Sequence, residues 1–87
     1  MPTLVIISQN EDFYGVIAEQ AKSELAADSE IAATPEAAKS LALKADLIIS
    51  DAPLAGKWAV PVLVADRPIH LAKMLEKIRT QLQQKNS

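Results

Sequence analysis

Two apolar stretches that each end in aspartate decide the fold: LIISD at residues 47–51 and VPVLVAD at residues 60–66. Continuous apolar runs bounded by polar or turn residues predict buried strands, and strands buried on both faces belong to parallel sheets. In parallel α/β sheets, ligands bind just beyond the carboxyl ends of the strands. We therefore expect Asp51 and Asp66 at the ligand-binding end of such a sheet.

The chain before these stretches begins with a strand and a helix. The β-branched run LVII at residues 4–7 predicts the first, central strand. Apolar residues then recur at helical spacing over residues 13–25, which predicts an amphipathic helix of roughly four turns. Ser8 and Glu11 have the spacing of a capping box at its start. Gly15, inside this helix, is expected to allow close packing on the sheet.

A second strand and two further helices complete the pattern. Residues 30–34 predict a weak strand, which we place at a sheet edge because it has few large apolar side chains. Thr34 and Pro35 predict the start of the second helix, as N-cap and first helical residue. Pro68 opens the last helix, and residues 84–87 are expected to form a frayed tail. The predicted buried stripe of this last helix consists of Leu71, Ala72, Leu75, Ile78 and Leu82.

These elements predict one small α/β domain over residues 1–87, in the order βαβαββα. Right-handed crossovers give a four-stranded, mainly parallel sheet with strand order 2-1-3-4 and three helices. The direction of the fourth strand stays open. Residues 52–59 can span about 26 Å, and a parallel return past the third strand needs about 16 Å. Parallel crossovers normally contain a dozen or more residues, so an antiparallel strand is the alternative, and it would move Asp66 to the opposite end of the sheet.

The charge and composition exclude several classes of function. The formal net charge is -2 and the lysines are spread along the chain, so no basic surface is expected for nucleic-acid phosphates. No apolar run approaches the ~20 residues that cross a bilayer. The chain has no cysteine for a disulfide, a thiolate metal site or a nucleophile. We expect a cytoplasmic protein that binds neither nucleic acid nor membrane.

Three parts of the chain resemble the receiver domain of two-component response regulators. They are LVII with Glu11 and Asp12 behind it, DLIISD ending on Asp51, and VLVADRPIHLAKMLEKIRTQL at residues 62–82. The resemblance implies that Glu11 and Asp12 hold Mg²⁺ and that Asp51 accepts a phosphoryl group. The chain departs from that family by lacking about one strand and one to two helices before residue 60. It also carries ADRP at residues 65–68, where the family has a lysine before proline.

The element order also resembles the IIB component of the sugar phosphotransferase system, a small four-stranded α/β domain. The segment KADLIISDAPLAGKWAVPVLVAD at residues 44–66 is similar to its strand–loop–strand region. The phosphocysteine of that family follows the first strand, where this chain has ISQN at residues 7–10 and no cysteine. The phosphocarrier chemistry therefore does not transfer, and we interpret both families as relatives in fold and not in function.

Four acids are candidates for a metal site. Glu11, Asp12, Asp51 and Asp66 would meet beyond the strand ends if the fourth strand is parallel, and Mg²⁺ prefers a few carboxylates together with water. With Mg²⁺ bound, Asp51 would attack a phosphoryl donor. The alternative, which we favour, is structural and needs no cofactor. In it Asp12 and Asp66 cap helices, and Asp51 stabilises the turn that follows it.

His70 is the one histidine of the chain and follows Pro68 near the start of the last helix. A helix N-terminus stabilises an anion, so a phosphohistidine at this position is a second phosphoryl hypothesis. The more ordinary interpretation is a partly exposed surface residue, since catalysis would need a base or metal partner within reach.

The loop PLAGKW at residues 53–58 holds the only tryptophan. An exposed aromatic ring beside a glycine is typical of a binding surface. The alternative is that Trp58 folds back to cover the open edge of the sheet or fills the gap left by a missing crossover helix. Tyr14 is expected to face outward at the same end of the sheet. The predicted partner-binding residues are Tyr14, Leu54, Lys57, Trp58, Arg67 and His70.

No nucleophile, metal cluster or cofactor loop is complete in this sequence, whereas polar and aromatic residues gather at one end of the predicted sheet. We therefore predict a small non-catalytic regulatory or protein-interaction domain without a cofactor. Its partner would be another protein or a second copy in a homodimer, since an edge strand gains burial by pairing. The alternative functions are a divergent phosphoacceptor, with Asp51 and Mg²⁺, and a phosphocarrier, with His70.

Overall fold

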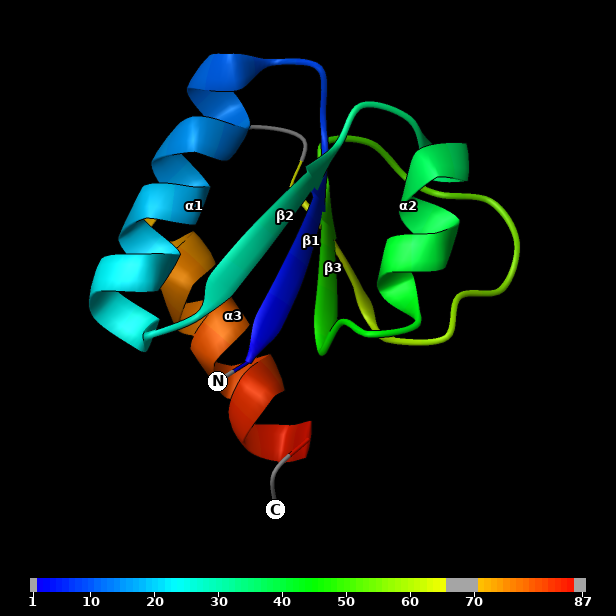
Figure 1. Ribbon diagram of the computed structural model, residues 1–87. Coiled ribbons are helices and arrows are strands. Elements are labelled where there is room, and N and C mark those ends of the chain that lie inside the picture. The colour runs from blue at the N-terminus through cyan, green and yellow to red at the C-terminus, as the bar shows by residue number, and fades with distance from the viewer. Residues whose placement is uncertain (1, 66–70, 86–87) are drawn as a thin grey trace.

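The structure is a computed structural model that describes residues 2–65 and 71–85 (Figure 1). The described elements follow the predicted order βαβαββα. They are β1 (Thr3–Ile7), α1 (Glu11–Leu25), β2 (Asp28–Ala32), α2 (Pro35–Ala42), β3 (Leu47–Ser50), β4 (Val62–Val64) and α3 (Leu71–Lys85).

The four strands form one parallel sheet in the order β2-β1-β3-β4, which confirms the predicted fold class and strand order. The open question about the last strand is answered, because β4 runs parallel to β3 with Ile48 opposite Val62 and Ser50 opposite Val64. The connection between these two strands contains no helix. Residues 51–61 therefore return along the whole of β3 as a loop, which is shorter than the usual parallel crossover.

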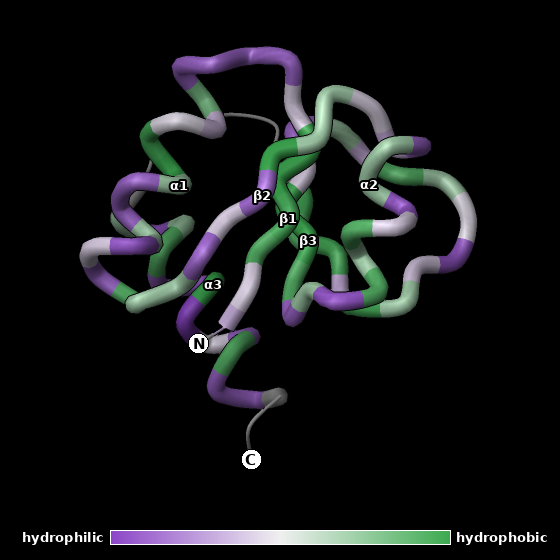
Figure 2. The backbone as a smooth tube through the Cα atoms, in the orientation of Figure 1, coloured by the Kyte–Doolittle hydropathy of each residue, from purple (hydrophilic) through white to green (hydrophobic). Residues whose placement is uncertain are grey.

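The two faces of the sheet have different covers, and Figure 1 shows α1 and α3 on one side and α2 with loop 51–61 on the other. We call the first side the two-helix face and the second the loop face. Both are built from buried side chains that alternate along the strands, as the pleat requires, and Figure 2 shows these hydrophobic strands at the centre of the molecule. The buried strand residues of the two-helix face are Leu4, Ile6, Leu47 and Ile49, and those of the loop face are Val5, Ile7, Ala32 and Ile48.

The start of α1 differs from the predicted capping box. Asn10 is the N-cap, and its side chain accepts hydrogen bonds from the backbone N–H groups of Asp12 and Phe13. The prediction that Ser8 or Asp12 caps this helix is therefore wrong, because Ser8 lies two residues before the cap and its backbone N–H still bonds to Ala32 of β2, and Asp12 is already inside the first turn. A Cβ atom at Gly15 would meet nothing within 4 Å, so the expected close packing of this glycine on the sheet is also wrong.

The second strand begins two residues earlier than predicted. Ala26 adopts the left-handed conformation (φ 52°) and ends α1, which lets β2 start at Asp28. Residues 33 and 34 then belong to the turn into α2, where Thr34 is the N-cap and Pro35 the first helical residue, as predicted. The position of β2 at a sheet edge is confirmed.

The buried residues of α3 match the predicted buried stripe only in part. Ile78 and Leu82 are buried and Leu75 is half-buried, but Ala72 is exposed. The side chain of Leu71 and the start of the helix at Pro68 lie outside the described residues. The helix continues through Lys85, so two residues of the predicted tail are helical.

Candidate functional site

The strand order places a crevice at the carboxyl ends of β1 and β3. From β1 the chain crosses to β2 on one side of β1, and its next strand, β3, lies on the other side of β1. The strand order therefore reverses between β1 and β3. Open α/β sheets bind ligands outside the strand ends at such a reversal. A cavity of about 320 Å³ opens there, lined by residues from three connections. They are Ile7 at the end of β1 with Ser8 and Gln9 after it, Ala33 before α2 with Pro35 at its start, and Ser50 at the end of β3 with residues 51–54 after it.

A hydrogen bond joins the two strand ends at the floor of this crevice. The Ser8 Oγ donates to Asp51 Oδ2 at 2.8 Å and accepts from the backbone N–H of Asn10 at 3.0 Å. The Asp51 backbone N–H donates to the carbonyl of Ile7 at 3.3 Å. Because Ser8 is 2% exposed, the Asp51 carboxylate is held in place by a partner with little freedom to move.

Ser50 takes the role that the structural interpretation gave to Asp51. The backbone N–H of Ala52 donates to Ser50 Oγ at 3.2 Å, and the same hydroxyl donates to the carbonyl of Ala52. This serine therefore closes the turn after β3, while the carboxylate of Asp51 is engaged across the crevice by Ser8. Neither serine was predicted as a site residue. The available signal was a hydroxyl residue at the end of each buried apolar run.

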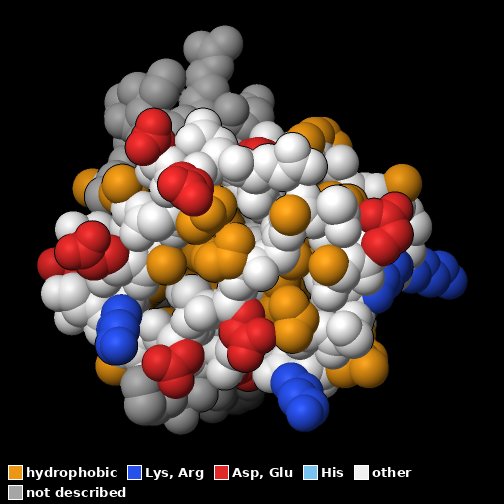
Figure 3. Space-filling view, turned by 45° about the horizontal axis from the view of Figure 1, so that its top comes forward, with side chains coloured by type: hydrophobic (Ala, Val, Ile, Leu, Met, Phe, Trp, Pro, Cys, Tyr) orange, Lys and Arg blue, Asp and Glu red, His pale blue; other side chains and the backbone are white. Residues whose placement is uncertain are grey.

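The predicted metal ligands lie in different places. Glu11 and Asp12 are exposed in the first turn of α1, and Asp51 is half-buried in the crevice. Asp66 lies outside the described residues. Within residues 2–65 and 71–85, no group of three or more histidine, aspartate or glutamate side chains could hold a metal ion. Figure 3 shows acidic side chains at several separate places on the side toward the strand ends. Magnesium binding by Glu11, Asp12 and Asp51 stays a prediction.

Trp58 packs on the loop face of the sheet. Its half-buried ring contacts the cluster around Ile48, together with Leu54. Lys39 Nζ lies 4.1 Å from the centre of the ring and donates to the carbonyl of Lys57 at 3.1 Å. The Trp58 Nε1–H donates to the carbonyl of Ala55 at 3.3 Å. The ring thus lies where a crossover helix would cover the sheet, in agreement with the structural alternative.

The other predicted partner-binding residues are placed as follows. Lys57 is exposed. Tyr14 was expected to face outward, but it is half-buried and packs against the cluster of the two-helix face. Its partial burial, and after that the neighbouring carboxylate of Glu11, raise the pKa of Tyr14 above its ordinary value. Arg67 and His70 lie outside the described residues, so their roles in partner binding and phosphoryl transfer stay predictions.

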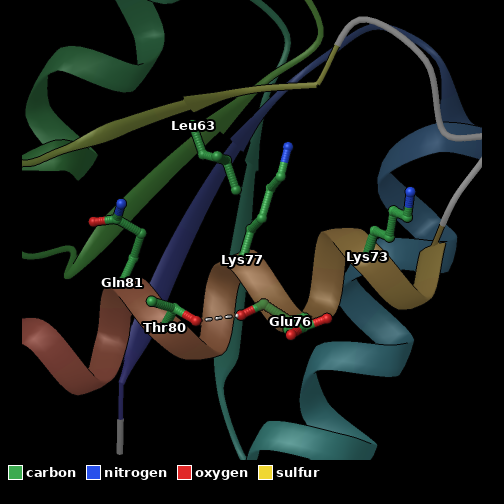
Figure 4. A pocket seen from close by; sticks show the side chains of 6 residues that line it. All are labelled: Leu63, Lys73, Glu76, Lys77, Thr80 and Gln81. Carbon is green, nitrogen blue, oxygen red and sulfur yellow. Dashed lines mark hydrogen bonds between the residues drawn. The ribbon is translucent and has the colours of Figure 1, made fainter.

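A second cavity, of about 500 Å³, lies between β4 and α3 on the two-helix face. Figure 4 shows Lys77 and Gln81 extending from α3 toward β4 beside Leu63, with Lys73 and Glu76 on the first turns of the helix. The Thr80 hydroxyl donates to the Glu76 carbonyl at 2.9 Å, inside the helix. This cavity was not predicted, because it depends on where α3 packs against the edge strand.

Comparison of the chain with models of protein families, with curated proteins and with solved structures found no match. The resemblances to receiver domains and to IIB components therefore stay predictions. Among the described residues, no helix combines the length and apolar character needed to cross a membrane.

Proposed function

We propose that this chain is a small non-catalytic regulatory domain that binds another protein through the crevice between the ends of β1 and β3. The observation that supports this function is the crevice itself, a cavity of about 320 Å³ at the reversal of strand order. Concave sites at this position of α/β sheets are common binding sites.

The walls of the crevice suit a protruding side chain of a partner. Pro35, Pro53 and Leu54 supply apolar surface, and Asp51 supplies a hydrogen-bond acceptor held by Ser8. Protein interfaces combine such apolar contacts with a few placed polar groups. A partner side chain with an apolar stem and a donor at its tip would use both parts.

A photo-crosslinking experiment tests this function. A photoreactive amino acid is placed at Ala52, which lines the crevice, or at Ala59, which is also exposed in the same loop but does not line it. In cells that produce the chain naturally, we expect one crosslinked protein from position 52 and none from position 59. Loss of that product in Asp51→Asn would support the role of the carboxylate. Equal products from both positions, or none from position 52, would contradict the proposal.

A second copy of the chain is the alternative partner for the same crevice. In that case Ala52→Arg, which fills the crevice, would convert a dimer into a monomer in sedimentation velocity, whereas Ala59→Arg would leave the dimer intact.

Phosphoryl acceptance by Asp51 is the second candidate function. It is favoured by one observation, that Asp51 directly follows β3 and its carboxylate lies in the crevice. Incubation with acetyl phosphate and Mg²⁺ would then add one phosphoryl group by mass spectrometry. The modification should be absent in Asp51→Asn and present in Asp28→Asn, which changes an exposed acid at the start of β2, outside the predicted metal site. An unmodified wild-type chain would remove this candidate.

A further inference from the structure

Both edges of the sheet carry backbone groups that face away from the neighbouring strand. In β2, Asp28 and Ala32 bond to β1, because the Asp28 N–H donates to Pro2 and the Ala32 carbonyl accepts from Ser8. The N–H and C=O groups of a strand alternate in direction from residue to residue. Ser29 and Ile31 therefore direct their backbone groups outward, on the side where the sheet ends.

The same reasoning applies to β4 at the opposite edge. The Pro61 carbonyl accepts from Ile48, and the Ala65 N–H donates to the Ser50 carbonyl at 2.7 Å. Residues 61, 63 and 65 thus bond to β3, and Val62 and Val64 direct their backbone groups outward. Each edge therefore presents two residues, spaced two apart, whose outward backbone groups have no backbone partner within residues 2–65 and 71–85 and can bond to an added strand.

We propose that copies of this chain associate head to tail, with β2 of one copy added in parallel to β4 of the next. In a pair of parallel strands, the backbone groups of one residue form hydrogen bonds with two residues of the other strand. These two residues flank the one that lies opposite it. With Ile31 opposite Leu63, the Ile31 N–H donates to the Val62 carbonyl and the Ile31 carbonyl accepts from the Val64 N–H. This register uses the outward groups of both edges.

The side chains of the two edges match in this register. Ile31 pairs with Ile6 of the two-helix face and is 40% exposed. Leu63 lies on that same face, packed against its cluster. Parallel addition keeps the two-helix faces of both copies on one side, so the side chain of Ile31 would lie beside Leu63 and lose exposed apolar surface.

The charges of the two edges favour unlike pairing over like pairing. A groove of about 600 Å³ between β2 and α1 carries Glu19, Asp28 and Glu30 with Lys22, whereas the cavity beside β4 carries Lys73 and Lys77 with Glu76. Two β2 edges would bring acids together, and like charges opposite each other destabilise strand pairs. By register Asp28 and Glu30 share the loop face with Val5. In the proposed pairing Glu30 lies opposite Val62, so a β2 edge against a β4 edge brings no two acids together.

The surface of β2 has a further group without a partner. The Ser29 Oγ lines the groove between β2 and α1 and is buried without a hydrogen-bond partner in the described part of the chain. Buried polar groups in native structures are normally hydrogen-bonded. A strand added along this edge would close the groove and bring polar groups near the Ser29 hydroxyl.

The crevice at the ends of β1 and β3 is separate from this proposed interface.

A head-to-tail contact leaves an unpaired β2 edge at one end of every assembly and an unpaired β4 edge at the other end. In sedimentation velocity we therefore expect the mass of the wild-type chain to rise with concentration beyond that of a dimer. A chain that stays monomeric up to millimolar concentration would overturn the proposal.

Two proline variants test the direction of assembly. Ile31→Pro removes an outward N–H of β2, and Val64→Pro removes an outward N–H of β4. Proline is tolerated in an edge strand when its N–H side faces solvent. Each variant alone should be monomeric, and a mixture should form a one-to-one dimer and nothing larger, because one retains an intact β4 edge and the other an intact β2 edge. A mixture that stays monomeric, or one variant that assembles like wild type, would overturn the proposal.

A side-chain variant keeps the test decisive if either proline variant fails to fold. Ile31→Ala removes most of the apolar surface that would lie beside Leu63 and should weaken association about three- to tenfold. Val16→Ala removes a similarly exposed apolar side chain from α1 and should leave association unchanged. Ala52→Arg, in the crevice, should also leave it unchanged. Equal effects of Ile31→Ala and Val16→Ala would contradict pairing through the β2 edge.

Discussion

The two-helix face and the loop face have similar apolar strand side chains, but different elements cover them. On the two-helix face, α1 and α3 pack large side chains such as Phe13, Ile17 and Ile78 against the sheet. On the loop face, α2 contributes small alanines, and the remaining area is covered by half-buried residues of loop 51–61, including Leu54 and Trp58. The area of the sheet that a crossover helix would cover is therefore covered by the ring of Trp58 and its neighbours in the loop.

This difference has a physical consequence for how each face responds to change. Two packed helices cannot easily move into a cavity, because their own backbones are hydrogen-bonded and rigid. A loop moves at a smaller cost, since it has few buried contacts to lose. We expect equal truncations to be more damaging under the helices than under the loop.

Neighbouring isoleucines of β3 give the most direct test and the largest effect. Ile49 is fully buried on the two-helix face and Ile48 is fully buried on the loop face. We expect Ile49→Ala to lower the free energy of unfolding by about 4 kcal/mol and Ile48→Ala by about 3 kcal/mol, because the loop collapses into the second cavity more completely. Urea unfolding followed by circular dichroism measures both. A larger loss for Ile48→Ala would break the comparison.

Removing the ring of Trp58 should have the next largest effect. Trp58→Ala is expected to lower the free energy of unfolding by about 2 kcal/mol, which is less than for a fully buried tryptophan because this ring is half-buried. Trp58→Phe keeps a ring in the same place and should lose about half as much. If both variants unfold like wild type in urea, the ring is not part of the cover of the loop face.

The two glycines should respond with opposite signs. Gly56, in the loop, has a φ of 85°, which strains any residue with a Cβ, so Gly56→Ala should cost about 1 kcal/mol. Gly15 lies inside α1 with open space around its Cβ position, so Gly15→Ala should stabilise by about 0.5–1 kcal/mol. Thermal unfolding of the two variants compares the signs, and a loss in both would show that the Gly15 position is crowded.

The ammonium group above Trp58 should contribute a smaller amount. Lys39→Met keeps the aliphatic stem and removes the charge that lies 4.1 Å from the ring centre, which should cost about 0.5–1 kcal/mol. Lys44→Met is the matched control and should be neutral. A double-mutant cycle with Trp58→Ala separates the interaction with the ring, and a coupling energy near zero would assign no stabilising role to this contact.

The smallest expected effect is a loss of stability at alkaline pH, and it comes from Tyr14 on the two-helix face. The raised pKa of Tyr14 means that its neutral form is favoured in the folded chain. Its contribution to stability is therefore present below the unfolded pKa of about 10 and is lost as the pH rises through the higher folded pKa. Glu11→Gln removes the nearby charge and should lower this pKa. Ultraviolet titration of the single tyrosine measures it, and no change in Glu11→Gln would assign the shift to burial alone.

The sequence by itself determined the class, the strand order and the starts of α2 and β3. Buried strands such as LIIS need continuous apolar residues, and a helix start such as Thr34-Pro35 needs particular residues whatever the rest of the chain does. These requirements are local, so they can be read along the chain. The strand order followed from the handedness of crossovers, which is a general property of the polypeptide.

Only the tertiary structure decided the direction of β4, the cap of α1 and the partner of Asp51. The loop after β3 was long enough for either strand direction, and packing of Trp58 on the loop face accompanies the parallel one. Ser8 and Asn10 are both suitable caps, but Ser8 is engaged by Asp51, which lies 43 residues away in the chain. Such choices depend on contacts between distant segments, and no local pattern records which of several adequate partners a side chain will meet.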